Sequence, residues 1–159
     1  MPTDKRLRPE LCNCLAVRQA ARHVTQFYDQ FLAPAGLRTT QFSILARLQR
    51  LGPMTISLLA ADLVMDRTTL GRNLQPLERE GLVAVVKGRT DRRSREIRLT
   101  DPGIERLRTA VEGWVKAQAG FEAVFGEQRS SELRALLHAV SASELEGVSP
   151  RGLPQERPG

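Results

Sequence analysis

Apolar residues recur every three or four positions along most of the chain, which is the spacing of one face of an α-helix. The first such run extends from Leu11 to Leu32, and Pro34 and Gly36 after it favour a helix end. The pattern predicts four helices before residue 82: residues 11–32, a helix from a cap at Thr39 or Thr40 to Leu51, residues 55–64 and residues 66–80.

The third and fourth of these helices are very close together in the sequence. Thr55 and Asp66 are good N-cap residues for them. Only Met65 and Asp66 separate the two apolar runs. Two short helices joined by so tight a turn suggest a helix-turn-helix.

After Gly81 the apolar period changes to that of extended chain. Residues 82–86 are typical of one strand, and Ile97 and Leu99 alternate with charged residues in a second. Gly88 and Asp91 between them are turn residues. A β-hairpin is therefore expected directly after the helix-turn-helix.

Two further helices are expected after the hairpin. Thr100 and Pro102 mark the start of the first, and the second carries the apolar residues of 133–140. The final stretch, residues 147–159, has three Gly and three Pro and is expected to be a disordered tail. The chain is thus predicted to be mainly α with a small β-hairpin.

Charge narrows the range of partners. The net charge is +6 and the pI is near 10.3, and clustered Lys and Arg bind a polyanion by releasing its condensed counterions. An anionic membrane surface would also fit. No apolar run is long enough to span a membrane and the N-terminus lacks the apolar core of a signal peptide, so a cytoplasmic protein without a membrane partner is expected.

The fourth expected helix has a polar face suited to DNA. On a helical wheel its leucines lie on one side and are expected to be buried. The opposite side carries Thr68, Arg72, Gln75 and Arg79. Thr69 and Asn73 flank that group. Such side chains can read base edges in a major groove or bond the phosphates beside it. The alternative is an ordinary solvated helix face.

The hairpin tip concentrates cations on a very small element. Like charges so close together repel one another unless a polyanion is present, and arginines on an extended tip can enter a minor groove. A merely solvated hairpin is the alternative interpretation. The charged residues of the tip are Lys87, Arg89, Asp91, Arg92, Arg93 and Arg95.

Two segments, "DRTTLGRNLQPLEREGLV" and "DRRSREIRLTDPG", together with the order of elements, resemble the MarR family of bacterial winged helix-turn-helix regulators. The wing pattern is the specific part of this resemblance, which covers about residues 11–145. Its positions here are Asp91, Arg93, Ile97, Leu99, Thr100 and Gly103.

The resemblance implies a homodimer in which a winged helix-turn-helix lobe is flanked by N- and C-terminal dimerisation helices. The corresponding domains are residues 1–34, 35–100 and 101–146. Each subunit would offer a recognition helix and a wing to half of a pseudo-palindromic site on double-stranded DNA, as a transcriptional regulator that most commonly represses. No cofactor is implied.

Individual DNA contacts also follow from the resemblance. Arg93 matches the wing arginine that enters the minor groove, and Asp91 matches the acid that positions it. Pro76 departs from a regular helix, which either kinks after Asn73 or ends early, and this places Gln75 and Arg79 in doubt. The positions that match base or phosphate contacts in the recognition helix are Arg67, Thr68, Thr69, Arg72 and Asn73.

Regulators of this family respond to a small phenolic or aromatic effector or to cysteine oxidation. Cys14 aligns with the peroxide-sensing cysteine of the OhrR branch, and Tyr28 with a tyrosine of that branch. Cys12 and Cys14 are therefore candidate redox residues, with small buried residues of a helical interface as the alternative. A metal site with His23 is not expected, because nine residues of helix separate it from Cys14.

Other classes of function have less support. An enzyme is not expected, because the sequence has no phosphate-binding glycine loop or nucleophile motif and only two histidines. The stronger rival is a winged-helix protein-interaction module without specific DNA binding. The cationic wing favours DNA over that rival.

Overall fold

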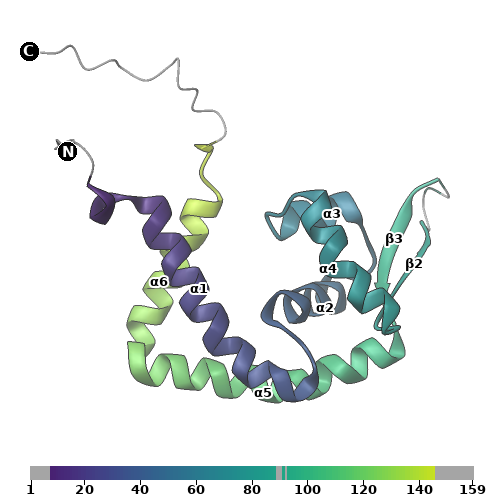
Figure 1. Cartoon of the computed structure of the whole chain (residues 1–159). Coiled ribbons are helices and arrows are strands. Elements are labelled where there is room, and N and C mark those ends of the chain that lie inside the picture. Colours follow the sequence, from purple (N-terminus) through teal and green to yellow (C-terminus); the bar gives the residue numbers. More distant parts are fainter. Residues whose placement is uncertain (1–7, 89–90, 92, 146–159) are drawn as a thin grey trace, which may run out of the picture. The chain divides into compact units, whose positions relative to one another are not determined.

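The computed structural model describes residues 8–88, 91 and 93–145 and is mainly helical with one small sheet (Figure 1). The chain divides into two compact units, one up to Gly120 and one from Phe121 onward. No helix in the described ranges has the length and apolar content needed to cross a membrane. In chain order the elements are η1 (Pro9–Leu11), α1 (Asn13–Leu32), η2 (Ala33–Ala35), α2 (Thr39–Leu51), β1 (Met54–Thr55), α3 (Ile56–Asp62), α4 (Arg67–Arg79), β2 (Val83–Lys87), β3 (Arg95–Leu99), α5 (Asp101–Phe125) and α6 (Glu127–Ser141).

The start of α2 is capped differently from the sequence expectation. Arg38 is the N-cap residue and Thr39 is already helical. The carboxylate of Asp29, in α1, accepts hydrogen bonds from the Thr39 backbone N–H at 2.7 Å and from its hydroxyl at 2.6 Å. A residue from the preceding helix therefore does the capping, and the end of α1 is fixed to the start of α2.

The core of the first unit is built from leucines that α2, α3 and α4 direct toward one another. Leu45, Leu59 and Leu70 are fully buried, and each represents one of these helices. Burying such a side chain contributes about 1.5–3 kcal/mol relative to leaving it exposed. The predicted apolar stripe of α4 is confirmed by the burial of Leu70, Leu74 and Leu77.

The sheet has three antiparallel strands in the order β1-β3-β2. The predicted hairpin forms β2 and β3, whose register pairs Val85 with Ile97 and Lys87 with Arg95. The two-residue strand β1, in which Met54 pairs with Ile97, was not predicted. A strand of two residues is too short to show any alternation.

Helix α5 begins against the turn that ends α4. Thr100 caps it by accepting the Gly103 N–H at 3.1 Å, and the Thr100 hydroxyl donates to the Gly81 carbonyl at 2.6 Å. A Cβ at Gly103 would lie 2.0 Å from the Leu82 carbonyl oxygen. Backbone is therefore packed directly on backbone at this contact. Arg106 adds an ion pair to Glu80 at 3.2 Å.

Further along α5, a second glycine makes a similar contact. A Cβ at Gly113 would lie 2.2 Å from the carbonyl oxygen of Phe31, near the end of α1. The two glycines allow one helix to pack closely against the end of α1 and against the base of the hairpin.

The second unit contains the end of α5 and the helix α6. Gly126, with φ of 98°, turns the chain between them. The rings of Phe121 and Phe125 lie 5.4 Å apart, and the guanidinium of Arg129 lies 4.4 Å above the Phe125 ring. Arg134 pairs with Glu122 at 3.2 Å. The expected tail, residues 147–159, lies outside the described residues.

We expect Gly103→Ala to destabilise the protein by about 1–3 kcal/mol, because the added methyl group must displace the Leu82 carbonyl. Urea-induced unfolding followed by circular dichroism measures this loss. The atom nearest to the added methyl group belongs to the Leu82 backbone, which cannot move aside as a flexible side chain could. A variant as stable as the wild type would contradict this account of the contact.

Candidate nucleic-acid interface

The segment between α3 and α4 is a closed turn. The Met65 N–H donates to the Ala60 carbonyl at 2.8 Å, and Val64 adopts a left-handed φ of 52°. A β-branched residue rarely occupies that region. The turn therefore carries strain, and it places α4 across α3 as the sequence predicted.

The first turn of α4 is organised by its own side chains. Asp66 accepts the Thr69 backbone N–H at 2.8 Å through Oδ1 and the Thr69 hydroxyl at 2.6 Å through Oδ2. The Thr69 hydroxyl, and then its backbone N–H, lower the pKa of the Asp66 carboxyl below its ordinary value of 3.8. Since the hydroxyl hydrogen of Thr69 is committed to Asp66, Thr69 stabilises the helix start in this structure.

The polar residues expected on the outer face of α4 lie at the surface. Asn73 is half-buried, and its amide nitrogen donates to the Thr69 carbonyl at 2.9 Å. That bond orients the amide and leaves its oxygen to accept a hydrogen bond from a partner. The remaining expected contacts, all exposed, are Arg67, Thr68, Arg72 and Gln75.

Pro76 does not end the recognition helix early. Helix α4 continues through it to Arg79, and the Glu80 N–H donates to the Pro76 carbonyl at 3.0 Å. The alternative of an early end is therefore wrong. Gln75 stays on the same helix as Arg72 and one turn further along.

Hydrogen bonds join the described residues near the end of the hairpin. Asp91 Oδ1 accepts the Arg93 N–H at 2.8 Å, and the Asp91 carbonyl accepts the Ser94 N–H and hydroxyl at 3.0 and 2.7 Å. A Cβ at Gly88 would lie 2.1 Å from the Ser94 hydroxyl, so the turn requires glycine there. Asp91 thus positions Arg93 through the backbone.

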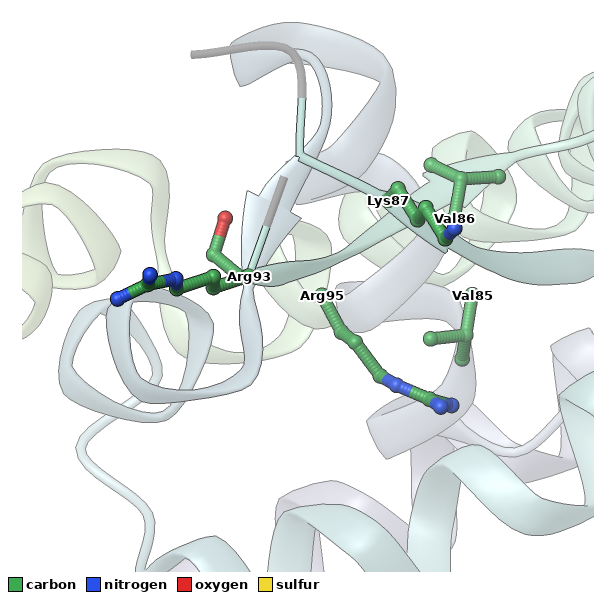
Figure 2. A pocket seen from close by; sticks show the side chains of 6 residues that line it. Val85, Val86, Lys87, Arg93 and Arg95 are labelled. Atoms are coloured by element: carbon green, nitrogen blue, oxygen red, sulfur yellow. The ribbon is translucent and has the colours of Figure 1, made fainter. Parts of the chain in front are cut away.

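Three cations surround a hollow of about 390 Å³ on this hairpin, lined by Val85, Val86, Lys87, Arg93, Ser94 and Arg95 (Figure 2). The side chains of Arg93 and Arg95 leave the hairpin in different directions, and Arg95 lies on the side of Val85 (Figure 2). The two remaining expected wing contacts, Arg89 and Arg92, lie outside the described residues.

Lys87 and Arg95 face each other directly across the two strands. Like charges in this arrangement are destabilising. Within the described part of the chain neither one forms an ion pair. The sequence places Lys87 among the cations of the tip, and the strand register shows that it lies directly opposite Arg95. An anionic partner would remove the repulsion.

The two cysteines lie at the start of α1 and are exposed. Cys12 is the N-cap residue, with extended backbone, and its Sγ accepts the Leu15 N–H at 3.4 Å. Cys14 is the second helical residue. Cys12 thus precedes the first helical residue, and its Sγ is engaged with the N-terminus of the helix. Among the described residues no group of His, Cys, Asp and Glu could hold a metal ion.

Tyr28 is remote from these thiols within one chain. Fourteen residues of α1 separate it from Cys14, which corresponds to about 21 Å along the helix axis. Its hydroxyl bonds to the side chain of Gln118 in α5. Any approach of Tyr28 to a cysteine would need a second copy of the chain.

A helix-turn-helix followed directly by a cationic β-hairpin defines a winged helix-turn-helix protein. The described geometry of α3, α4, β2 and β3 has all of these parts. The predicted fold class, mainly α with a small β wing, is confirmed.

Comparisons with known proteins identify the family. The sequence model described as MarR family matches residues 37–94. Over 115 residues the chain is 34% identical to the HTH-type transcriptional regulator PecS of Dickeya dadantii, covering 70% of this chain and 69% of PecS. The chain belongs to the MarR family of transcriptional regulators, as its sequence pattern indicated. Its relatives are regulators and not enzymes.

Solved structures agree with this assignment. The crystal structure of the M. tuberculosis transcriptional regulator MosR is 37% identical, with a TM-score of 0.72, and covers 86% of this chain and 100% of MosR. A second structure shows MosR in complex with DNA, at 40% identity and a TM-score of 0.71, covering 84% and 99%.

Asp66 gives a test of the helix start. We expect Asp66→Ala to lower the melting temperature at neutral pH, whereas Asp66→Asn keeps a capping oxygen and stays closer to the wild type. Because hydrogen bonds lower the pKa of Asp66, its contribution is complete above the ordinary value of 3.8 and is lost as pH falls through the lowered pKa.

The stability gap between the wild type and Asp66→Ala should therefore shrink in acid below about pH 3.8. Urea unfolding of both proteins across the acidic range measures it. A gap that stays constant through that range would show that the Asp66 charge has no part in the cap.

Proposed function

We propose that this protein is a transcriptional repressor that binds double-stranded DNA as a homodimer on a pseudo-palindromic operator. The observation that carries the proposal is the polar, cationic outer face of α4 together with a wing in which Asp91 holds the backbone of Arg93. DNA binding by the relative MosR supports it. The protein is a MarR-family transcription regulator in any case.

In this proposal α4 enters the major groove. Arg67, Thr68 and Arg72 contact phosphates and base edges from its first two turns, and Asn73 and Gln75 complete the face. Thr69 contributes through the Asp66 cap, which fixes the N-terminal turn that would meet the bases. A fixed donor geometry lowers the entropy cost of binding.

The wing supplies a second contact. Arg93, held by Asp91, enters the minor groove, whose negative potential attracts arginine. Arg95 and Lys87, which face each other across the strands, would neutralise phosphates. Arg89 and Arg92 are proposed as further phosphate contacts from their charge alone. DNA binding would thereby relieve the repulsion between Lys87 and Arg95.

The partner in the dimer is proposed to be a second copy of the chain. Helices outside the winged lobe expose apolar side chains that this chain alone leaves uncovered, a feature of association surfaces. These residues are Leu15 and Val17 in α1, Val111 and Val115 in α5, and Leu136, Leu137 and Val140 in α6. They support the assignment of residues 1–34 and 101–146 to dimerisation.

The releasing signal is proposed to act on the helices outside the winged lobe. Cys12 and Cys14 are exposed and lie at the start of α1, where a hydroperoxide could reach them. A small aromatic effector is the second candidate, supported by a hollow of about 310 Å³ between the end of α1, η2 and α5, with Phe31, Thr109 and Lys116 in its lining. Volumes of this order suit a small ligand.

A winged-helix module that binds only protein remains the rival function. The two differ in their response to salt, because a protein that neutralises phosphates loses DNA affinity steeply as salt rises. The first experiment is therefore binding to the DNA upstream of the protein's own coding sequence at several salt concentrations.

We expect salt-dependent binding by the wild type and a loss of about tenfold or more in Arg93→Ala, equal to about 1.4 kcal/mol. Arg108→Ala is the matched control, because it removes the same charge from an exposed pair with Glu105 on α5. Fluorescence anisotropy measures both affinities. Absence of salt-dependent binding, or equal losses in the two variants, would count against the proposed interface.

For the signal, we expect an organic hydroperoxide to abolish DNA binding and a thiol reductant to restore it. Two thiols would give up two hydrogen atoms to the peroxide, yielding a disulfide, an alcohol and water. Cys12→Ser should remove this response without unfolding α1, because serine is itself a good N-cap residue. Cys14→Ser is the companion variant. Binding that ignores the oxidant would assign the signal to an effector instead.

A further inference from the structure

Helix α4 contains one residue without a side chain, Gly71, in its second turn. Glycine in a helix interior is less favourable than alanine by about threefold to fivefold in the equilibrium constant for helix formation. A glycine that weakens the recognition helix needs a reason.

For each of the other glycines among the described residues, the fold itself gives a reason why glycine is needed. Four adopt a left-handed φ, namely Gly36, Gly52, Gly81 and Gly126. In another four a Cβ would meet a neighbouring atom at 3.3 Å or less, namely Gly88, Gly103, Gly113 and Gly120. Gly71 belongs to neither group, because a Cβ there would have no heavy atom within 4 Å.

The surroundings of Gly71 indicate what could approach it. Arg67 and Thr68 precede it by one helical turn, Gln75 follows it by one turn, and Arg72 is its neighbour; all four are exposed. Helix α4 exposes no large apolar side chain. A partner that comes close at Gly71 is therefore polar and anionic, unlike the apolar faces of α1, α5 and α6.

We propose that Gly71 is the point where the DNA duplex comes into van der Waals contact with the backbone of α4. This inference rests on the proposed function and adds a residue that sets how deeply the helix enters the groove. Glycine is the usual residue where a backbone and a ligand approach closely. The side chains of Arg67 and Arg72 then reach the phosphates on either side of Gly71.

The test uses Gly71→Ala and Gly71→Leu in the full-length protein. Both replacements favour the helix, so the melting temperature should rise, by about 2–4 °C for alanine. Affinity for the upstream DNA should fall by about tenfold in Gly71→Ala and further in Gly71→Leu. The dependence of affinity on salt should stay as in the wild type, because no charge is removed.

Gln49→Ala is the matched control. It raises the helix propensity at an exposed position of α2 and adds no side-chain volume to α4. It should leave DNA affinity unchanged. Wild-type binding together with unaltered affinity in Gly71→Leu would overturn the inference and leave the proposed function intact. A fall in melting temperature for Gly71→Ala would also overturn it, because the glycine would then serve the fold. Absence of DNA binding by the wild type would refute both the proposed function and this inference.

Discussion

The close packing of α5 on the turn after α4 is the constraint on which the DNA-binding lobe depends. Gly103 allows the helix backbone to lie against the Leu82 carbonyl, and Thr100 bonds the same turn through Gly81. That turn is both the end of α4 and the start of β2, so its position sets the recognition helix and the wing together. Since α5 also contacts the end of α1 at Gly113, this one helix packs both on the winged lobe and on α1.

The parts of this fold that the sequence predicted are those determined by neighbouring residues. Asp66 caps α4 from within three residues of Thr69, and Gly88 and Asp91 form their turn within seven residues of chain. The parts it did not predict need contacts between distant residues. Asp29 caps α2 from another helix, and β1 exists only because β3 is beside it. The polar residues of the candidate site could be chosen from a helical wheel, but the pairing of Lys87 with Arg95 required the strand register.

Several features of the winged lobe cost stability. Val64 holds a left-handed backbone conformation, Pro76 removes a helical hydrogen bond, and Lys87 faces Arg95. The buried leucines of α2, α3 and α4 offset these costs. Strain of this kind tends to gather where a protein meets its partner. All three features lie between the end of α3 and the start of β3, the part of the chain that carries the proposed interface.

The proposed signal at the start of α1 would have to act over a long distance to reach α4. Seventeen residues of α1 separate Cys12 from Asp29, about 25 Å along the helix. The far end of α1 is bonded to α2 through Asp29 and packed on α5 at Gly113, so α1 cannot move there without moving its neighbours. Because α5 is in turn fixed to the end of α4, a small tilt of α1 would move α5, and the whole winged lobe with α4 would move with it. In the proposed dimer, two lobes that meet consecutive major grooves would tolerate little change in their separation, so such a shift would release the dimer from its operator.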